Sequence, residues 1–407
     1  MSVNISPIYL KDMTDLQSKR DQWEPYAWFH KMRNESPVFY DANQDVWNVF
    51  RYQDVKRVLS NYELFTSKRT RSFFPVAHTT ENRSTVNFSD PPVHTHRRGF
   101  LSKAFSAKNI SNWESRIKKV IDEIMTPIRD QDQFDMVEDF AIPLPIIVMA
   151  ELLGVPSRDR ELFKRWSTTM FLPHDKEKQS EIMQQKQQCL KEFAQYMIPI
   201  VQEKRKNPTN DIISDLIVTE CDGEHLNDQE VLSSSMALLG GGFEQTTNLI
   251  ANSFYCFLID QKGIYPKLRE EPNLIPLAME EVLRYRFPVC LDRQVAQDTN
   301  VFGHEMKKGQ MVVAWVSAAN RDEQEFPHAE EFDIHRTENK KHLSFGAGAH
   351  FCPGSALARL KVRVALTTVI EHFADIRLPD SFCLEDHLIE SVLGQSLKSL
   401  PVIVQMD

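Results

Sequence analysis

The chain has 407 residues, of which 42% are hydrophobic, so it can bury a sizeable core and hold an enclosed site. Its formal net charge of −9 argues against nucleic acid as a partner, because phosphate binding needs clustered basic surface. No repeat, low-complexity tract or Gly/Ser linker marks a boundary, so we predict one domain over residues 1–407.

The cysteines and the amino-terminal segment indicate the compartment. Six cysteines, at positions 189, 221, 256, 290, 352 and 383, show neither CxxC pairs nor a zinc-like spacing, which predicts reduced thiols. The first twenty residues lack the apolar run of a signal peptide, and the longest apolar segment, 142–155, is interrupted by prolines and Glu151. We therefore expect a cytoplasmic protein without a membrane span.

The first elements in chain order are a hairpin and a series of helices. Two β-rich stretches, 37–40 and 46–50, flank the turn-prone residues 41–43 and predict a β-hairpin. From about Asp54 to Glu281 apolar residues recur at spacings of three and four, which predicts helices. This pattern is seen in 55–62, 112–125 and 186–205.

The segment 228–260 is the longest candidate helix, with Asn227 or Asp228 as its cap. If unbroken, it would be about 50 Å long at about 1.5 Å per residue, and its apolar character on several faces places it in the core. Strand-like pieces such as 311–316 then interrupt the helices. Together these patterns predict a mainly α fold with a minor β region.

One cysteine, Cys352, stands between a glycine-containing loop and a predicted helix. The loop FGAGAHFCPG precedes SALAR, whose alanines and leucines continue as a helix toward Phe373. A helix N-terminus carries partial positive charge, so we expect it to lower the pKa of Cys352 and hold the sulfur as thiolate. Glycines 346, 348 and 354 would let the backbone turn closely around a flat ligand.

The spacing around Cys352 leaves three interpretations open. The first is an inert buried cysteine. The second is a nucleophile with His350 or His342 as its base. The third is the sole protein ligand of a haem iron, a thiolate that pushes electron density to favour O–O cleavage.

The complete pattern F-G-x-G-x-H-x-C-x-G-x-x-L-A-R resembles the haem-ligand signature of the cytochrome P450 superfamily, and every fixed position is present. Other segments resemble family motifs in the expected order. Glu281 and Arg284 resemble its E-x-x-R helix, with Arg336 as third member of the charge cluster. Residues 90–98 resemble the segment that meets the haem propionates, and 241–244 resemble the oxygen-binding groove.

The resemblance covers essentially the whole chain and is closer than superfamily level. The stretches 143–150, 252–255 and 339–343 resemble the steroid and terpenoid hydroxylases of bacilli, exemplified by steroid 15-beta-hydroxylase. It implies the cytochrome P450 fold, an α-rich lobe plus a small β lobe around a buried haem b (iron protoporphyrin IX). It also implies a monomer that acts on a bulky, hydrophobic small molecule.

The resemblance assigns roles to individual residues. Cys352 is the expected iron ligand, and buried haem carboxylates need charged or hydrogen-bonding partners. The expected cofactor-binding residues are His94, Arg98, Arg293, Phe345, His350, Cys352 and Gly354. Glu281, Arg284 and Arg336 are expected to form a partly buried ionic cluster that fixes the cysteine loop. The substrate pocket is expected to be lined by Ala237, Gly241, Val289, Leu291 and Gln395.

The oxygen-groove motif departs from the family pattern at one position. Gln245 stands where the family usually has threonine, and Thr246 follows. A glutamine exchanges hydrogen bonds but passes a proton less readily than a hydroxyl does. The expected proton route therefore uses ordered water with Glu244 and Thr246, beside Gln245. Distortion of the helix is credible here because residues 240–242 are all glycine.

The implied activity is insertion of one oxygen atom from O₂ into a C–H bond of a steroid- or terpenoid-like substrate. No nicotinamide or flavin fingerprint of the G-x-G-x-x-G kind occurs, so NAD(P)H electrons must arrive through a ferredoxin or flavodoxin with its reductase. Two alternatives stay open, a haem-dependent sensor or carrier that binds without turnover, and a hydroxylase driven by hydrogen peroxide.

Basic residues flank the cysteine side in the sequence, and we expect them to steer an acidic redox partner. They are His96, Arg97, Arg98, Lys103 and Lys108 in one segment, and Lys340, Lys341, Arg359, Lys361 and Arg363 in the other.

Overall fold

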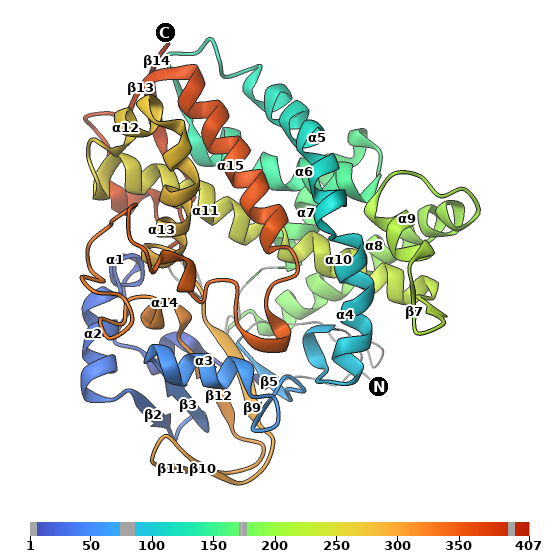
Figure 1. Cartoon of the computed structure of the whole chain (residues 1–407), viewed down its shortest axis with the longest axis vertical. Helices are drawn as coiled ribbons and strands as arrows, with labels where there is room; N and C mark the ends of the chain where they lie inside the picture. The colour runs from blue at the N-terminus through green and yellow to red at the C-terminus, as the bar shows by residue number, and fades with distance from the viewer. Residues whose placement is uncertain (1–5, 74–85, 171, 173–176, 390–394, 407) are drawn as a thin grey trace.

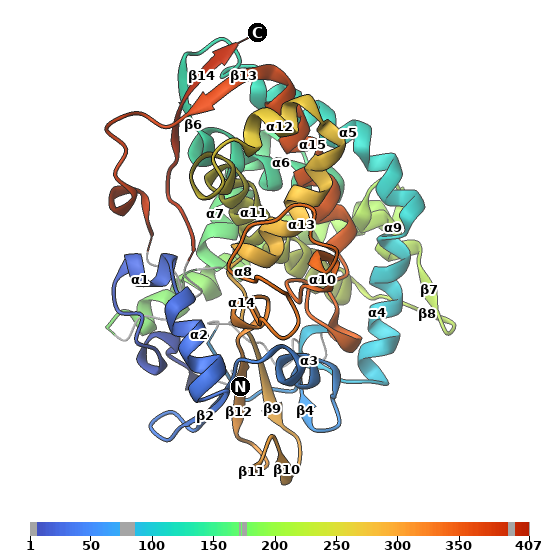
Figure 2. The same ribbon diagram turned by 60° about the vertical axis from the view of Figure 1, so that its left-hand side comes forward.

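The structure is a computed structural model that describes residues 6–73, 86–170, 172, 177–389 and 395–406. Helices fill most of the molecule, and the larger sheet lies at its lower end (Figure 1). A small sheet of β13, β14 and β6 lies at the opposite end, beside the C-terminus (Figure 2). The mainly α fold with a minor β region is confirmed.

The α-helices alternate with short connections through the described chain. They are α1 Lys19–Trp23, α2 Tyr26–Glu35, α3 Tyr52–Ser60, α4 Val93–Ala104, α5 Ala107–Met125, α6 Pro143–Leu153, α7 Arg160–Met170, α8 Gln179–Lys206, α9 Ile212–Val218, α10 Asp228–Gly241, α11 Glu244–Tyr255, α12 Ile264–Glu270, α13 Ile275–Tyr285, α14 Val316–Ala319 and α15 Ser355–His372. Two π-helical turns, Met136–Ala141 and Cys256–Asp260, adjoin α6 and α11.

The larger sheet joins segments far apart in sequence. Its order is β2 (Val38–Asp41), β3 (Val46–Val49), β12 (Met311–Ala314), β9 (Leu291–Val295) and β4 (Phe65–Thr66). The predicted hairpin is confirmed as β2 and β3, which pair antiparallel with Val38 opposite Val49. β12 runs parallel to β3 and antiparallel to β9, with Met311 opposite both Val46 and Gln294.

The remaining strands form one three-stranded sheet and three two-stranded sheets among the described residues. β13 (Phe373–Arg377) pairs with β14 (Pro401–Met406), which also pairs with β6 (Gln133–Asp135). The two-stranded sheets are β1 (Ser6–Pro7) with β5 (Arg71–Ser72), β7 (Glu220–Cys221) with β8 (Glu224–His225), and β10 (Thr299–Val301) with β11 (His304–Met306).

The segment predicted as the longest helix is broken. α10 ends at Gly241 and α11 begins at Glu244, with Phe243 at φ −96° and ψ −78° between them. Each glycine disfavours helix by about 0.8–1.0 kcal/mol relative to alanine, which explains a break at this run. The condition of an unbroken helix is therefore not met, the distortion expected at the glycines is present, and α8, with 28 residues, is longer than either part. The predicted cap is confirmed, because Asn227 forms a capping box with Glu230.

Candidate functional site

A backbone hydrogen bond closes the loop before Cys352, and the loop packs closely against α3. The Cys352 N–H donates to the Phe345 carbonyl at 2.8 Å. Gly346 and Gly348 have φ of 74° and 68°, a region that favours glycine. A Cβ built at Gly348 would lie 2.7 Å from the Ser60 Cα, so a side chain there would push the loop off α3.

The Cys352 sulfur lies at the start of α15, with Gly354 as the helix cap. Burial raises the pKa of the free Cys352 thiol above its ordinary value, although the Gly354 N–H and the charges of Arg98, Lys361 and Arg359 act to lower it. The expectation of a lowered pKa is therefore wrong for the free thiol, because desolvation outweighs the helix N-terminus. A bound cation would be needed to hold the sulfur as thiolate.

The two histidines considered as bases for Cys352 are engaged elsewhere. His342 is buried, and its Nε2 lies 3.0 Å from Glu280 Oε2. His350 Nε2 lies 3.0 Å from Ser67 Oγ, and burial is the main cause that lowers its pKa to about 3. Neither contact favours proton transfer from the thiol, so the geometry argues against the nucleophile interpretation.

Four residues expected at the haem carboxylates come from three parts of the chain and gather together. His94 and His350 lie with ring centroids 4.1 Å apart. Both ring nitrogens of His94 are buried and have no hydrogen-bond partner in the described structure. Arg293 is buried and donates to the Asp292 carbonyl at 2.8 Å, and burial lowers its pKa to about 10. Arg98 donates to the Phe351 carbonyl and so joins α4 to the cysteine loop.

The break between α10 and α11 presents the residues expected to move protons. Burial raises the pKa of Glu244 to about 7, while the charge of Lys186 opposes the shift. The Thr246 hydroxyl donates to the Gly242 carbonyl at 3.0 Å. Gln245 Oε1 is buried without a hydrogen-bond partner among the described residues. The first turn of α11 therefore carries both a carboxyl with a raised pKa and an amide oxygen that no described residue satisfies.

One face of α10 is open although the helix lies between others in both views (Figure 1, Figure 2). α10 packs against α6, α7, α8 and α9, yet Ala237 and Gly241 are exposed. A Cβ built at Gly241 would meet no heavy atom within 4 Å. Val289 and Leu291 are half-buried, and Leu291 Cδ1 would lie 3.7 Å from a Cβ built at Gly346 of the cysteine loop. The described residues therefore leave α10 uncovered at Ala237 and Gly241, whereas Leu291 is placed beside the cysteine loop.

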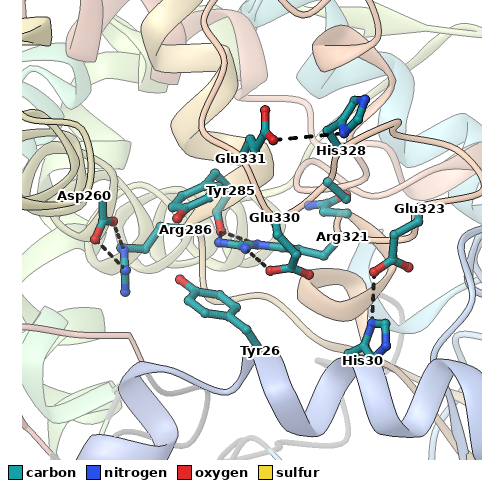
Figure 3. Close-up of polar contacts among 12 residues, drawn as sticks. Tyr26, His30, Asp260, Tyr285, Arg286, Arg321, Glu323, His328, Glu330 and Glu331 are labelled. Carbon is teal, nitrogen blue, oxygen red and sulfur yellow. Dashed lines mark hydrogen bonds and ion pairs between the residues drawn. The ribbon is translucent and has the colours of Figure 1, made fainter.

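The Gln395 side chain belongs to a different part of the interior. Gln395 is buried, and its Nε2 donates to the Tyr26 hydroxyl at 2.8 Å, so its amide is engaged away from α10. Tyr26 belongs to a buried aromatic and charged cluster in which Arg321 lies 3.7 Å from the ring centroids of Tyr26 and Tyr285 (Figure 3). Such a cluster, joining α2 to the end of α13, satisfies the polar end of Gln395 better than an apolar pocket would.

The structure brings Glu281, Arg284 and Arg336 together. Arg284 donates from Nε and Nη2 to the two Glu281 oxygens at 2.9 and 2.7 Å, and Arg336 Nε lies 3.4 Å from Oε1. The Glu281 and Arg284 side chains are fully buried, so the expectation of partial burial understated their isolation from water. Arg284 also donates to the carbonyls of Asn320 and Ala329, which fixes the segment leading to the cysteine loop.

Sequence reasoning missed Glu280, which holds the cysteine loop at both ends. Its carboxylate contacts His342 before the loop and Arg359 after it, at 3.0 and 2.9 Å. Although burial acts to raise it, these two hydrogen bonds lower the pKa of Glu280 to about 2. Arg359 also stacks 4.4 Å from the Phe345 ring centroid. No sequence signal marked Glu280, because its partners lie far along the chain.

Most of the basic residues beside the cysteine have a partner within the protein, and five of the ten pair with acidic side chains. Lys361 is buried and donates to the Gly242 carbonyl, so it does not belong to a surface. The internal pairs are Arg359 with Glu280, Arg363 with Glu114, Arg97 with Glu230, His96 with Asp222 and Glu224, Lys341 with Glu325, and Lys103 with the Glu220 carbonyl. Lys340 is exposed, and the side chain of Lys108 lies outside the described residues. The expected steering surface is therefore smaller than the sequence suggested.

The described residues fit the haem that the resemblance implies. The unpartnered nitrogens of His94 and the buried cation of Arg293 need an anion, as two haem carboxylates would supply. The thiol of Cys352 is a suitable ligand for iron. The open space at Gly241 is consistent with close approach of a flat group to α10.

Among the described residues, no helix has both the length and the apolar character that crossing a membrane requires.

Comparison with family models matches residues 9–393 to the family described as Cytochrome P450. The chain is also similar to curated proteins of Priestia megaterium. It is 47% identical over 401 residues to "Cytochrome P450(MEG)", covering 97% of this chain and 98% of that protein. It is 43% identical over 408 residues to "Cytochrome P450(BM-1)", covering 99% and 100% of the two chains.

Solved structures of CYP109E1 from Bacillus megaterium are similar in fold. The complex of that protein with corticosterone has a TM-score of 0.85 and 36% identity, over 94% of this chain and 99% of that chain. Its complex with testosterone has a TM-score of 0.84 and 36% identity, over 93% and 99% of the two chains.

Proposed function

Since this chain belongs to the cytochrome P450 family and is a haem monooxygenase, we propose that it hydroxylates a steroid- or terpenoid-like molecule. The observation that carries the proposal is the open face of α10, where Ala237 and Gly241 contribute almost no side-chain bulk. A wide, rigid, apolar ligand needs such a surface. CYP109E1, similar to this chain, has been crystallised with corticosterone and with testosterone.

The residues that would hold the haem have separate tasks. Cys352 would bind the iron, with Phe345 and Gly354 shaping the loop around it. Arg98, Arg293, His94 and His350 would hold the two carboxylates. When bound, the haem supplies O₂ activation: one oxygen atom enters a C–H bond, and the other leaves as water with two electrons and two protons.

Residues at the break between α10 and α11 would supply the protons that the reaction needs. Glu244, whose pKa burial raises to about 7, can hold a proton near neutral pH and release it to ordered water. The Thr246 hydroxyl uses its proton on the Gly242 carbonyl but keeps lone pairs that can accept from such a water. Gln245 can position the water but does not ionise.

Electrons would reach the site from NAD(P)H through a ferredoxin or flavodoxin and its reductase. The sequence carries no nucleotide-binding fingerprint of its own. Because acidic side chains pair with half of the ten basic residues that flank Cys352, we expect a weak, transient complex rather than strong electrostatic steering. Residues 1–407 would act in this as one domain.

A second function, ligand binding without turnover, is favoured by one observation. Gln245 stands where a proton-passing hydroxyl is usual, and its oxygen is buried without a partner among the described residues. In that case the protein would be a haem-dependent sensor or carrier.

Reconstitution separates the two functions. Purified protein with NAD(P)H, a ferredoxin and its reductase is offered a panel of steroids and terpenoids, and products are identified by mass spectrometry. Hydroxylated product supports the proposal. Ligand-induced spectral change without product from the wild type, together with product from Gln245→Thr, supports the binding protein instead. Product with hydrogen peroxide alone would show that no redox partner is needed.

A further inference from the structure

Arg69 lies beside the residues expected at the haem carboxylates, although no motif marked it. Its Nη1 donates to the Asp292 carbonyl at 3.3 Å, and Arg293 Nη1 donates to the same oxygen at 2.8 Å. Two guanidinium groups therefore converge on one carbonyl oxygen. The Arg69 side chain is only 11% exposed, and its guanidinium lies 4.5 Å from the Phe88 ring centroid.

Two buried carboxylates lie near Arg293, those of Asp292 and Asp90, and both also accept hydrogen bonds from other residues. Arg69 Nε lies 3.1 Å from Asp292 Oδ1, but Asp292 also accepts from Ser72 Oγ at 2.5 Å. Arg293 forms no ion pair among the described residues, and like charges buried together are costly without an anion. Burial first, and the charge of Arg69 second, lower the pKa of Arg293 to about 10, which supports their proximity.

The segment that carries Arg69 is bonded to β9 and to residues on both sides of the expected haem carboxylates. β4 pairs with β9, the strand of Asp292 and Arg293. Ser67 N–H donates to Asp90 Oδ1 at 2.8 Å, and Ser67 Oγ lies 3.0 Å from His350 Nε2. The position of Arg69 is therefore fixed by backbone pairing and not by its own ion pair alone.

We propose that Arg69 is a third guanidinium for the haem carboxylates, beside Arg98 and Arg293, and that it ties the segment from β4 to β5 to cofactor binding. The inference rests on the haem site described above. Asp292 then holds Arg69 in place and leaves Arg293 free to meet the anion. A residue that merely neutralised Asp292 would act on the stability of the protein and not on the cofactor.

The variants Arg69→Gln and Arg69→Lys test this, with Lys68→Gln as the matched control because the Lys68 side chain is exposed. Two properties of the holoprotein are measured, the rate of haem transfer to apomyoglobin and the ferric/ferrous reduction potential. A charged hydrogen bond lost from a buried carboxylate predicts about ten- to hundredfold faster haem loss for Arg69→Gln. The reduction potential of Arg69→Gln should shift to a more negative value. The reason is that a positive charge near the haem favours addition of an electron, and this substitution removes that charge. Arg69→Lys falls between, and Lys68→Gln matches the wild type.

Asp292→Asn tests the direction of the shift in reduction potential. This substitution removes one negative charge but keeps the backbone carbonyl and a side-chain oxygen that can accept from Arg69, so the potential should move to a more positive value, opposite to Arg69→Gln. An Arg69→Gln protein with wild-type haem loss and potential, altered only in melting temperature, overturns the inference while leaving the haem site intact. If Arg69→Gln does not fold, haem loss and reduction potential are measured for Arg69→Lys and Asp292→Asn instead. Wild-type values of both properties in both variants would overturn the inference. A wild-type protein that takes up no haem would instead refute the site itself.

Discussion

Lys361 donates a hydrogen bond from its Nζ to the Gly242 carbonyl oxygen, 3.1 Å away. This contact joins α15, which begins just after Cys352, to the break between α10 and α11. The Thr246 hydroxyl donates to the same oxygen at 3.0 Å. A carbonyl released by the break is thus satisfied by two side chains, and burial lowers the pKa of Lys361 to about 8.

Replacing Lys361 by methionine removes one of these donors while keeping the apolar stem. We expect a loss of about 1–3 kcal/mol in the free energy of unfolding of the holoprotein, because a charged hydrogen bond in the interior is lost. Urea unfolding measures it. Lys340→Met, at an exposed site, should stay within about 0.5 kcal/mol of the wild type. Equal effects of the two substitutions would show that the contact contributes nothing.

Glu281→Gln leaves Arg284 and Arg336 buried without their shared carboxylate. Breaking a buried charge pair by removing one partner costs about 3–5 kcal/mol, so we expect little folded holoprotein at 37 °C. Chemical unfolding and haem content per chain measure this. Glu331→Gln is the control, since its carboxylate is 74% exposed. A Glu281→Gln protein as stable as this control would contradict a supporting role for the cluster.

Gly348→Ala tests how closely the cysteine loop packs on α3. The new Cβ would lie 2.7 Å from the Ser60 Cα, in addition to the cost of a left-handed backbone at φ 68°. Gly303 has φ 79° and open space around it, so Gly303→Ala isolates the backbone cost, about 1–2 kcal/mol. Gly348→Ala should lower the melting temperature further and reduce haem content, whereas Gly303→Ala should leave haem content unchanged. Equal melting temperatures would contradict the close packing.

The pH dependence of turnover should follow Glu244. Because burial raises its pKa to about 7, the carboxyl is mostly protonated below pH 7 and ionised above it. Product formed per NAD(P)H consumed should therefore fall as pH rises through about 7. The free energy of unfolding should also fall as pH rises from the ordinary pKa of 4.5 to about 7. In this range the folded carboxyl still holds its proton, whereas the unfolded one has released it.

Glu244→Gln supplies the comparison for this pH dependence. The variant should show a lower yield of product per NAD(P)H that changes little between pH 6 and 8, because glutamine cannot ionise. A wild-type profile that stays flat across this range, or a variant with the same slope, would show that protons come from another group.

Local patterns in the sequence were enough for the hairpin, the helix after Cys352 and the Asn227 cap, because each depends on neighbours in the chain. Glu280 and Arg69 were not predictable, since their partners lie far along the chain. The contact of the Gln395 amide with the Tyr26 hydroxyl was not predictable either, because the two residues are far apart in the chain. The thiol pKa was misjudged because burial depends on tertiary packing.

The most direct test of iron ligation by Cys352 is the carbon monoxide difference spectrum of the dithionite-reduced protein, recorded for the wild type and for Cys352→Ala. The wild type should give the band typical of thiolate-ligated haem, and Cys352→Ala should lose it even when haem is still bound. A thiolate-type band that persists in Cys352→Ala, or a wild type that never shows one, would contradict ligation by this sulfur.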